Sequence, residues 1–383
     1  MKIVHISPET TYNDHWGYQE NLLTKYHSAL GNDVTLIVRN VQFVDGKISA
    51  TPESDYILTP ENVRVIRKRR KRYNLSFLND LFGYIEVYDE LSKIKPDLIF
   101  FHGFVSKTIK DAVKYKKNIN PNCVLIQDNH MDAEIGFANT LKGHLAAAYY
   151  KRLHFSTAAY VDKIYGVTPG RVDYARKVFG ASPEKSKTLI MGADDEKINF
   201  AEKSAIRNNI RSQYGIEDDE FLIVTGGKLD KKKNVIELMK SLHDFPKTKL
   251  LLFGNINDDI KAEFETILKN EPNIIHIGWI DSDKVYDYFF AADLVVFPGT
   301  HSVLWEQAVA SRVPCVFKYW EGMQHVDFGG NCVFIENVTV DTIKSTLSEL
   351  IPVTEKYVKM KSTAESDSAK RFLYSEIAKE SLR

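Results

Sequence analysis

Four polar residues within a short segment could bind a nucleotide: Thr300, His301, Ser302 and Glu306. We expect a helix to begin at Thr300, so that several backbone N–H groups lack intrahelical partners and can bind an anion such as phosphate. Glu306 follows about one turn later, and its carboxylate can accept two hydrogen bonds from the vicinal hydroxyls of a ribose. The same strand–turn–helix pattern also occurs in α/β proteins that bind nothing there. Other parts of the chain must therefore support the nucleotide hypothesis.

The strands that should position this group lie in the second half of the chain. Leu294–Phe297 is short and β-branched and ends at Pro298-Gly299, as a parallel strand does at its carboxyl end. Three more apolar runs end in glycine: Phe221–Thr225 before Gly226-Gly227, Leu250–Phe253 before Gly254, and Ile274–Ile277 before Gly278. Ligands of open α/β sheets bind at this edge. We therefore expect Gly227, Gly254 and Gly299 to line a ligand site.

Two lysines after the first of these strands could stabilise a leaving group. Lys228 and Lys233 lie directly before a helix expected over Val235–Leu242. Cations and a helix dipole at this point would hold a pyrophosphate. When the bond to the terminal phosphate breaks, negative charge grows on the leaving group, and fixed cations stabilise the transition state more than the ground state. The alternative is a basic surface loop without a function.

Two histidines of the first half follow predicted buried strands. His102 comes after one strand, and His130 comes after the next, between Asp128 and Asp132. His130 could contact substrate or act as a positioned base. Its alternation with carboxylates would also suit a metal site, and the third alternative is a histidine that is only hydrogen-bonded.

Gly17, at the start of the first predicted helix, would let a ligand approach closely, although glycine is also an ordinary turn residue there.

Length and composition indicate a globular protein of two domains, because 383 residues exceed one ordinary core and the hydrophobic fraction is 44%. The net charge is zero, but the halves divided at Ile190 carry about +7 and −7. Cys123, Cys315 and Cys332 have neither metal-ligand spacing nor an even count, so we expect buried thiols in a reducing cytosol. No apolar run is long enough to span a bilayer. We expect a cytoplasmic protein.

A run of six basic residues, Arg67–Arg72, could contact an anionic surface. Each clustered cation adds roughly 1 kcal/mol near anionic lipid headgroups, so peripheral binding to the inner face of the membrane is the functional hypothesis. A solvated loop is the alternative. Nucleic acid is not expected, because no nucleic-acid-binding module accompanies the run and the other half is acidic. The segment Phe137–Phe155 mixes apolar and basic residues and could lie at the same interface, or could simply pack in its own domain.

The order of these pieces resembles the GT-B glycosyltransferases, and within them the retaining family 4. The family's Gly-Arg-x-x-x-x-Lys-Gly loop is similar to residues 227–234, with Lys228 at the arginine position and Lys233 at the lysine position. Residues 191–194 resemble the linker motif, and the turn at Gly278-Trp279-Ile280 resembles the loop that holds the nucleotide base. Gly17 stands at the family's first glycine-rich loop. His130 lies near the histidine that lines the donor sugar pocket.

One departure from the family concerns its two glutamates, which are eight positions apart. Glu306 fits the second, which contacts the ribose, but Pro298 occupies the place of the first, which contacts the donor sugar. Sugar contacts must then come from His301, Ser302 or backbone amides. Lysine at 228 keeps the charge of arginine but loses its bidentate fork. Residues 16–23 and 298–307 also resemble transferases of bacterial surface and capsular polysaccharide synthesis.

The resemblance implies an α/β chain of two Rossmann-like domains facing a cleft. Residues 1–193 would bind acceptor, 194–360 would bind the nucleotide-sugar donor, and 361–383 would form a C-terminal helix that can pack back on the first domain. The implied reaction moves a hexosyl group from a nucleotide-sugar, foremost a UDP-sugar, to a glycan or lipid-linked acceptor with retention. No metal or other cofactor is expected, because Lys228, Lys233 and the helix start at Thr300 would replace it. The alternatives are a nucleotide-sugar epimerase of the same fold and a degenerate, non-catalytic subunit.

Overall fold

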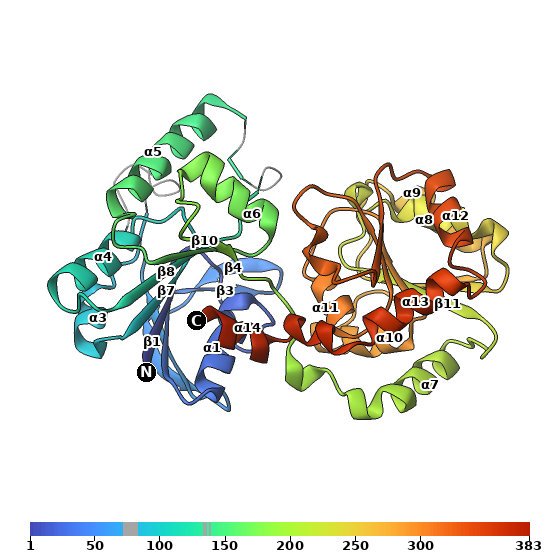
Figure 1. Ribbon diagram of the computed structural model, residues 1–383, viewed down its shortest axis with the longest axis horizontal. Coiled ribbons are helices and arrows are strands. Elements are labelled where there is room, and N and C mark those ends of the chain that lie inside the picture. Colours follow the sequence, from blue (N-terminus) through green and yellow to red (C-terminus); the bar gives the residue numbers. More distant parts are fainter. Residues whose placement is uncertain (72–82, 133–135, 138) are drawn as a thin grey trace. The chain divides into compact units, whose positions relative to one another are not determined.

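The computed structural model describes residues 1–71, 83–132, 136–137 and 139–383. They form two compact units (Figure 1): unit 1 comprises Met1–Ile190 and Ile377–Arg383, and unit 2 comprises Met191–Glu376. Each unit carries its own largely parallel sheet with helices on it, so the predicted class of two Rossmann-like domains is confirmed. The boundary predicted at 193/194 compares with 190/191 in the structure, and only the last residues of the predicted C-terminal segment belong to unit 1.

Unit 1 is built on an eight-stranded sheet in the order β10-β9-β8-β7-β1-β2-β6-β5, with a separate hairpin of β3 and β4. Within the eight-stranded sheet every neighbouring pair is parallel except β5 with β6, and the β3–β4 hairpin is antiparallel. The strands are β1 (Lys2–Ser7), β2 (Asp33–Arg39), β3 (Val41–Val44), β4 (Lys47–Ala50), β5 (Ser54–Leu58), β6 (Val63–Lys68), β7 (Leu98–His102), β8 (Val124–Asn129), β9 (Lys163–Gly166) and β10 (Ser186–Thr188).

Central strands of unit 1 are buried on both faces, as their continuous apolar sequences predict. All five residues of β7 and the last five of β1 are buried. The helices beside them are α1 (Gln19–Ala29), α3 (Tyr88–Ile94), α4 (Ile109–Asn118), α5 (Leu141–Thr157) and α6 (Pro169–Tyr174), and a π-helical turn, Ala175–Phe179, follows α6. The carboxyl ends of β7 and β8 therefore hold His102 and Asp128 rigidly in place.

Unit 2 is built on a six-stranded parallel sheet in the order β13-β12-β11-β14-β15-β16. Its strands are β11 (Phe221–Gly226), β12 (Thr248–Phe253), β13 (Ile274–His276), β14 (Leu294–Phe297), β15 (Cys315–Lys318) and β16 (Cys332–Ile335). The helices are α7 (Lys203–Gln213), α8 (Val235–Ser241), α9 (Lys261–Asn270), α10 (Val285–Ala291), α11 (Leu304–Ala310), α12 (Val340–Ser348), α13 (Glu355–Ala364) and α14 (Tyr374–Ser381), the last of which continues into unit 1. β11 and β14 are adjacent, so the turns at Gly227 and Gly299 leave the sheet side by side.

The helix expected to begin at Thr300 begins later, and this part of the prediction was wrong. α11 starts at Leu304, because residues 300–303 form an irregular loop before it. The backbone N–H of Thr300 donates to the carbonyl of Lys232 (3.1 Å), which ties this loop to the turn after β11. The residue that precedes the helix, Val303, forms no side-chain cap, so no hydroxyl group caps α11.

The basic run Arg67–Arg72 was considered either a contact with an anionic surface or a solvated loop, and the structure pairs most of its cations within unit 1. Arg67 and Lys68 belong to β6, where Arg67 is 3% exposed and pairs with Asp14 (3.1 Å). Three more side chains of the run are paired, Lys68 with Glu90, Arg70 with Glu9, and Lys71 with Glu86. Carboxylates of the same unit already neutralise these cations. Arg69 is exposed, and Arg72 lies outside the described residues.

The three cysteines are buried and unpaired, as expected. Across the described part of the chain, no helix combines the length and apolar character that crossing a bilayer requires.

Candidate functional site

Glycine turns at the carboxyl edge of the unit 2 sheet pack directly against one another. The N–H of Gly227 donates to the carbonyl of Phe253 (3.0 Å), and the N–H of Gly254 donates to that of Gly278 (2.6 Å). Gly254 has φ +115°, and a Cβ atom on it would lie 1.8 Å from the carbonyl oxygen of Gly227. Only glycine fits there. The turns predicted from the strand ends are thus brought together.

Lys233 reaches the turn after β14 and fixes its shape. Its Nζ donates to the carbonyl of Thr300 (2.7 Å), and a Cβ atom on Gly299 would lie 2.3 Å from the Cα atom of Lys233. Burial lowers the pKa of Lys233, although the nearby charge of Asp230 opposes that effect. Trp320, which the sequence did not single out, donates to the carbonyl of Gly299 (3.2 Å). Lys233 is therefore a positioned cation within this cluster of turns.

The loop before α11 has backbone N–H groups that can donate to an anion. The N–H of Thr300, which was predicted to be one of these donors, is instead bonded to the carbonyl of Lys232. Within the described ranges, the N–H groups of His301 and Ser302 have no acceptor. Lys228 is exposed and has no ion-pair partner among the described residues. An exposed cation and two backbone donors thus lie at the same edge of the sheet as Lys233.

Glu306 is the charged centre of a buried cluster with two histidines. Its side chain is fully buried, and its Oε1 atom accepts hydrogen bonds from Nε2 of His301 (2.8 Å) and Nε2 of His325 (2.8 Å). The other oxygen, Oε2, is buried without a partner among the described residues. Burial alone would raise the pKa of Glu306, but the charges and hydrogen bonds of the two histidines outweigh it and lower the pKa to about 2. The carboxylate is therefore kept ionised, with one oxygen left for another donor.

The histidine–glutamate cluster, His301, Glu306 and His325, has a suitable set of ligands for a transition metal, but its spacing is that of hydrogen bonds. Ligands of tetrahedral zinc at bonds of 2.0–2.1 Å lie about 3.4 Å from one another. Both imidazole nitrogens instead lie 2.8 Å from the same carboxylate oxygen. The cluster as it stands is held by N–H donors, and it would have to open to bind a metal.

Other predicted donor-site residues lie around this edge without a fixed role. Trp279 is 68% exposed and Ile280 is half-buried, both directly after Gly278. The carbonyl of Ser302 accepts from the N–H of Trp305 (3.0 Å), which closes the turn before α11. No sequence signal marked His325, because it lies in a short 3-10 helix, Gln324–Val326, after β15, and only its proximity to Glu306 indicates a role.

In unit 1, His130 shares a buried carboxylate with His102. Asp128 accepts from Nδ1 of His102 (2.8 Å) and from Nε2 of His130 (3.3 Å) through its Oδ2 atom. Burial would raise the pKa of Asp128, but the two histidines hold it well below its ordinary value. Partial burial would lower the pKa of His130, but the charge of Asp128 outweighs this and raises it. Asp128 therefore orients His130, whose side chain remains 37% exposed.

A row of histidines continues from His102 into the interior of unit 1. His102 contacts His5 (Nε2 to Nδ1, 3.0 Å), His5 contacts His27 (Nε2 to Nδ1, 2.9 Å), and His27 contacts the Ser381 hydroxyl (2.8 Å). Burial lowers the pKa of His5 and brings that of His27 to about 4.

Gly17, predicted to border the donor, lies just before α1, and a Cβ atom there would meet nothing within 4 Å. The protein itself does not require glycine at that position.

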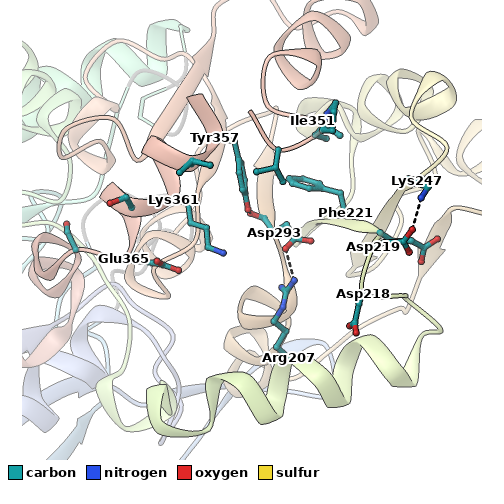
Figure 2. A pocket seen from close by; sticks show the side chains of 16 residues that line it. Arg207, Asp218, Asp219, Phe221, Lys247, Asp293, Ile351, Tyr357, Lys361 and Glu365 are labelled. Atoms are coloured by element: carbon teal, nitrogen blue, oxygen red, sulfur yellow. Dashed lines mark hydrogen bonds and ion pairs between the residues drawn. The ribbon is translucent and has the colours of Figure 1, made fainter. Parts of the chain in front are cut away.

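A pocket of about 880 Å³ lies at the opposite edge of the unit 2 sheet (Figure 2). Arg207 of α7 points at Asp293, which directly precedes β14, and the two form an ion pair (2.6 Å). Lys247, next to the start of β12, pairs with Asp219 (2.6 Å). This pocket lies at the amino ends of the strands and these cations are already paired. We therefore place the candidate site at the carboxyl edge instead.

Comparisons with known proteins agree with this geometry. Residues 206–367, less than half of the chain, match the family model described as "Glycosyl transferases group 1". The chain is 22% identical to alpha-galactosylglucosyldiacylglycerol synthase of Streptococcus pneumoniae, over 49% of this chain and 54% of that protein. It is 27% identical to TuaC of Bacillus subtilis, named as a glycosyltransferase of teichuronic acid biosynthesis, over 48% of this chain and 47% of that protein. The matches thus span about half the length of these curated relatives.

A solved structure resembles the chain over its whole length. The Anabaena protein Alr3699/HepE, determined in complex with UDP and glucose, is 15% identical, with a TM-score of 0.69 over 100% of this chain and 98% of that one. An identity this low informs on the fold alone, and the predicted GT-B class is confirmed at that level. The family match lies within unit 2, where Lys233, Glu306 and the glycine turns are found.

Proposed function

We propose that this protein is a glycosyltransferase that moves a sugar from a nucleotide-sugar to a glycan or lipid-linked acceptor. A UDP-sugar is the favoured donor, and synthesis of a surface polysaccharide or glycolipid is the favoured setting. The observation that carries the proposal is the convergence of Lys233, the glycine turns and the buried Glu306 at the carboxyl edge of the sheet that matches the family model. The names of the relatives, and the UDP of the similar Anabaena structure, support the setting and the donor.

Unit 2 would bind the donor through groups that its turns already hold in place. The unpartnered Oε2 of Glu306 is buried, so donor binding would have to uncover it before it accepts a ribose hydroxyl, while Oε1 stays with the two histidines. The backbone N–H groups of His301 and Ser302 would bind phosphate in place of the helix start first expected at Thr300. Trp279 and Ile280 would border the base.

The chemical step would use fixed charge rather than a metal. Lys233 is held by the carbonyl of Thr300, so it needs no reorganisation when the leaving diphosphate gains charge. Lys228, which is exposed, would close on the diphosphate from the solvent side. We propose retention at the anomeric carbon, with the leaving phosphate taking the acceptor proton. His130, oriented by Asp128, would then position substrate rather than act as the base.

The test of this function is nucleotide release from candidate nucleotide-sugars, measured with and without acceptor glycans and glycolipids, and repeated in a chelator. A transferase releases nucleotide mainly when acceptor is present, and chelation leaves the rate unchanged if Lys233 and Lys228 replace a metal. Release without acceptor, together with an altered free sugar, would instead identify an epimerase. Failure of every nucleotide to bind in calorimetric titration would contradict the donor site itself.

A further inference from the structure

Helix α5, labelled in unit 1 in Figure 1, carries large apolar side chains that are exposed to solvent. Leu141 is 77% exposed, Leu145 64% and Phe155 59%. At 3.6 residues per turn, these three lie with Ala148 and Arg152 within an arc of about 80°, and they extend over about 20 Å of helix. A surface helix of a globular protein normally places polar residues on this face. The exposed stripe therefore calls for a partner.

The opposite face of α5 explains why the helix does not bury this stripe itself. Ala146, Tyr150 and Leu153 are buried, and Tyr150 and Leu153 belong to the apolar core of unit 1. Thr140 caps the first turn by accepting from the N–H of Gly143 (3.1 Å). The helix is thus anchored through one face, and the other face is fixed in its outward direction.

The charges of α5 indicate what kind of partner fits. Its seventeen residues contain no aspartate or glutamate, whereas Lys142, Lys151 and Arg152 are all exposed around the apolar stripe. Among the described residues these three form no ion pair, although Lys151 lies over the ring of Phe155 at 5.9 Å. The described part of the basic run, Arg67–Lys71, is by contrast largely neutralised by carboxylates. Apolar side chains ringed by unpaired cations suit the interface of an anionic bilayer.

We propose that α5 lies in the surface of an anionic lipid bilayer, with Leu141, Leu145 and Phe155 among the acyl chains and its cations at the headgroups. At about 25 Å and with its inner face in the protein core, the helix lies along the interface and does not cross it. This binding needs no nucleotide-sugar and is independent of the proposed reaction. It would bring unit 1 to wherever a lipid-linked acceptor resides.

The experiment is co-sedimentation of the full chain with vesicles of phosphatidylcholine alone and of phosphatidylcholine with an equal share of phosphatidylglycerol. Each Leu→Ser change at 141 or 145 should lower the partition coefficient by roughly tenfold, because an inserted side chain is returned to water. The triple change K142Q/K151Q/R152Q should weaken binding to anionic vesicles by about a hundredfold and leave binding to neutral vesicles unchanged.

The matched control removes three exposed lysines from other parts of unit 1, with K93Q/K110Q/K117Q. Loss of binding only in the α5 variants supports the proposal, whereas an equal loss in the control would overturn it in favour of net charge. The proposal would also be overturned if the unmodified chain did not bind anionic vesicles. It would be overturned as well if the chain formed a dimer without lipid and Leu145→Ser dissociated that dimer, because the apolar stripe would then be covered by a second copy of the chain. Nucleotide titration of each variant should match that of the unmodified chain, which separates this proposal from the reaction. Leu141→Ser alone serves if a triple variant misfolds, because Leu141 is the most exposed of the three.

Discussion

Replacing Glu306 by glutamine tests the buried cluster most directly. The substitution keeps the shape and one acceptor oxygen, but it removes the charge and places an NH₂ group where the buried Oε2 has no partner among the described residues. The pKa of Glu306 is lowered from 4.5 to about 2. Since one pKa unit corresponds to about 1.4 kcal/mol, the ionised side chain contributes about 3 kcal/mol to the free energy of unfolding at neutral pH.

The sign of the pH dependence follows from the lowered pKa. A carboxyl whose pKa is lower in the folded state contributes its full stabilisation above pH 4.5 and loses it as the pH falls from 4.5 toward 2. The difference between the unmodified chain and Glu306→Gln should therefore stay near 3 kcal/mol from pH 7 to pH 5 and shrink below pH 4.5.

Urea unfolding followed by tryptophan fluorescence suits this measurement, because Trp305 of unit 2 is fully buried next to His301, with ring centroids 5.2 Å apart. The control is Glu265→Gln, at an exposed position of α9, which should unfold at the same urea concentration as the unmodified chain. Equal stability of Glu306→Gln and the unmodified chain at pH 7 would refute the reasoning, since the two histidine contacts would then not favour the charged form.

Three further predictions concern Lys233 and Gly254 of unit 2 and Asp128 of unit 1. Lys233→Ala should lower kcat by about 100-fold with less than tenfold change in donor affinity, because Lys233 would stabilise charge that grows in the transition state. The control Lys231→Ala, at an exposed neighbouring position, should change neither kcat nor donor affinity. Equal losses of kcat and donor affinity in Lys233→Ala would show instead that Lys233 binds the donor equally in the ground state and the transition state. Gly254→Ala should cost at least about 3 kcal/mol in urea unfolding, because its Cβ would meet the carbonyl of Gly227, whereas Gly17→Ala should unfold like the unmodified chain; a stable Gly254→Ala would contradict the close contact. Asp128→Asn should lower the pKa of His130, which NMR titration of its ring would measure. In the unmodified chain, protonated His130 stabilises the fold fully below its ordinary pKa, and this stabilisation is lost as the pH rises through its raised pKa in the folded state; the variant should lack it. An unchanged His130 titration in the variant would disprove the pairing with Asp128.

The fold was largely predictable from local sequence, because apolar runs that end in glycine mark parallel strands. The predicted strand Leu294–Phe297 coincides with β14, and the three other strands predicted in unit 2 differ from β11, β12 and β13 by one or two residues at one end. β6 was missed because its basic residues suggested a solvated loop. Arg67 is buried with Asp14, distant in sequence, as its counter-charge and with the carbonyl of Tyr12 as a further acceptor. A sequence pattern cannot show such a partner.

The candidate site was predictable in its residues but less so in its contacts. The sequence predicted that the carboxylate of Glu306 faces a ligand, but it did not predict the two histidine donors, which come from the loop before α11 and from a 3-10 helix after β15. The N–H of Thr300 was expected to be free and is bonded to Lys232, because the neighbouring turn lies within reach. Long-range hydrogen bonds of this kind depend on the sheet order, which strand patterns alone do not give.

The return of residues 377–383 to unit 1 has a consequence for the synthesis of the chain. The ribosome makes Ser381, which closes the row of histidines at His27, roughly 190 residues after the rest of unit 1. At about 5–20 residues per second, this interval lasts about 10–40 s. During that time the buried side of His27 stays open to water, and the nascent first domain is one helical segment short of its native state. Unit 1 can therefore reach full stability only after translation has passed through the whole of unit 2.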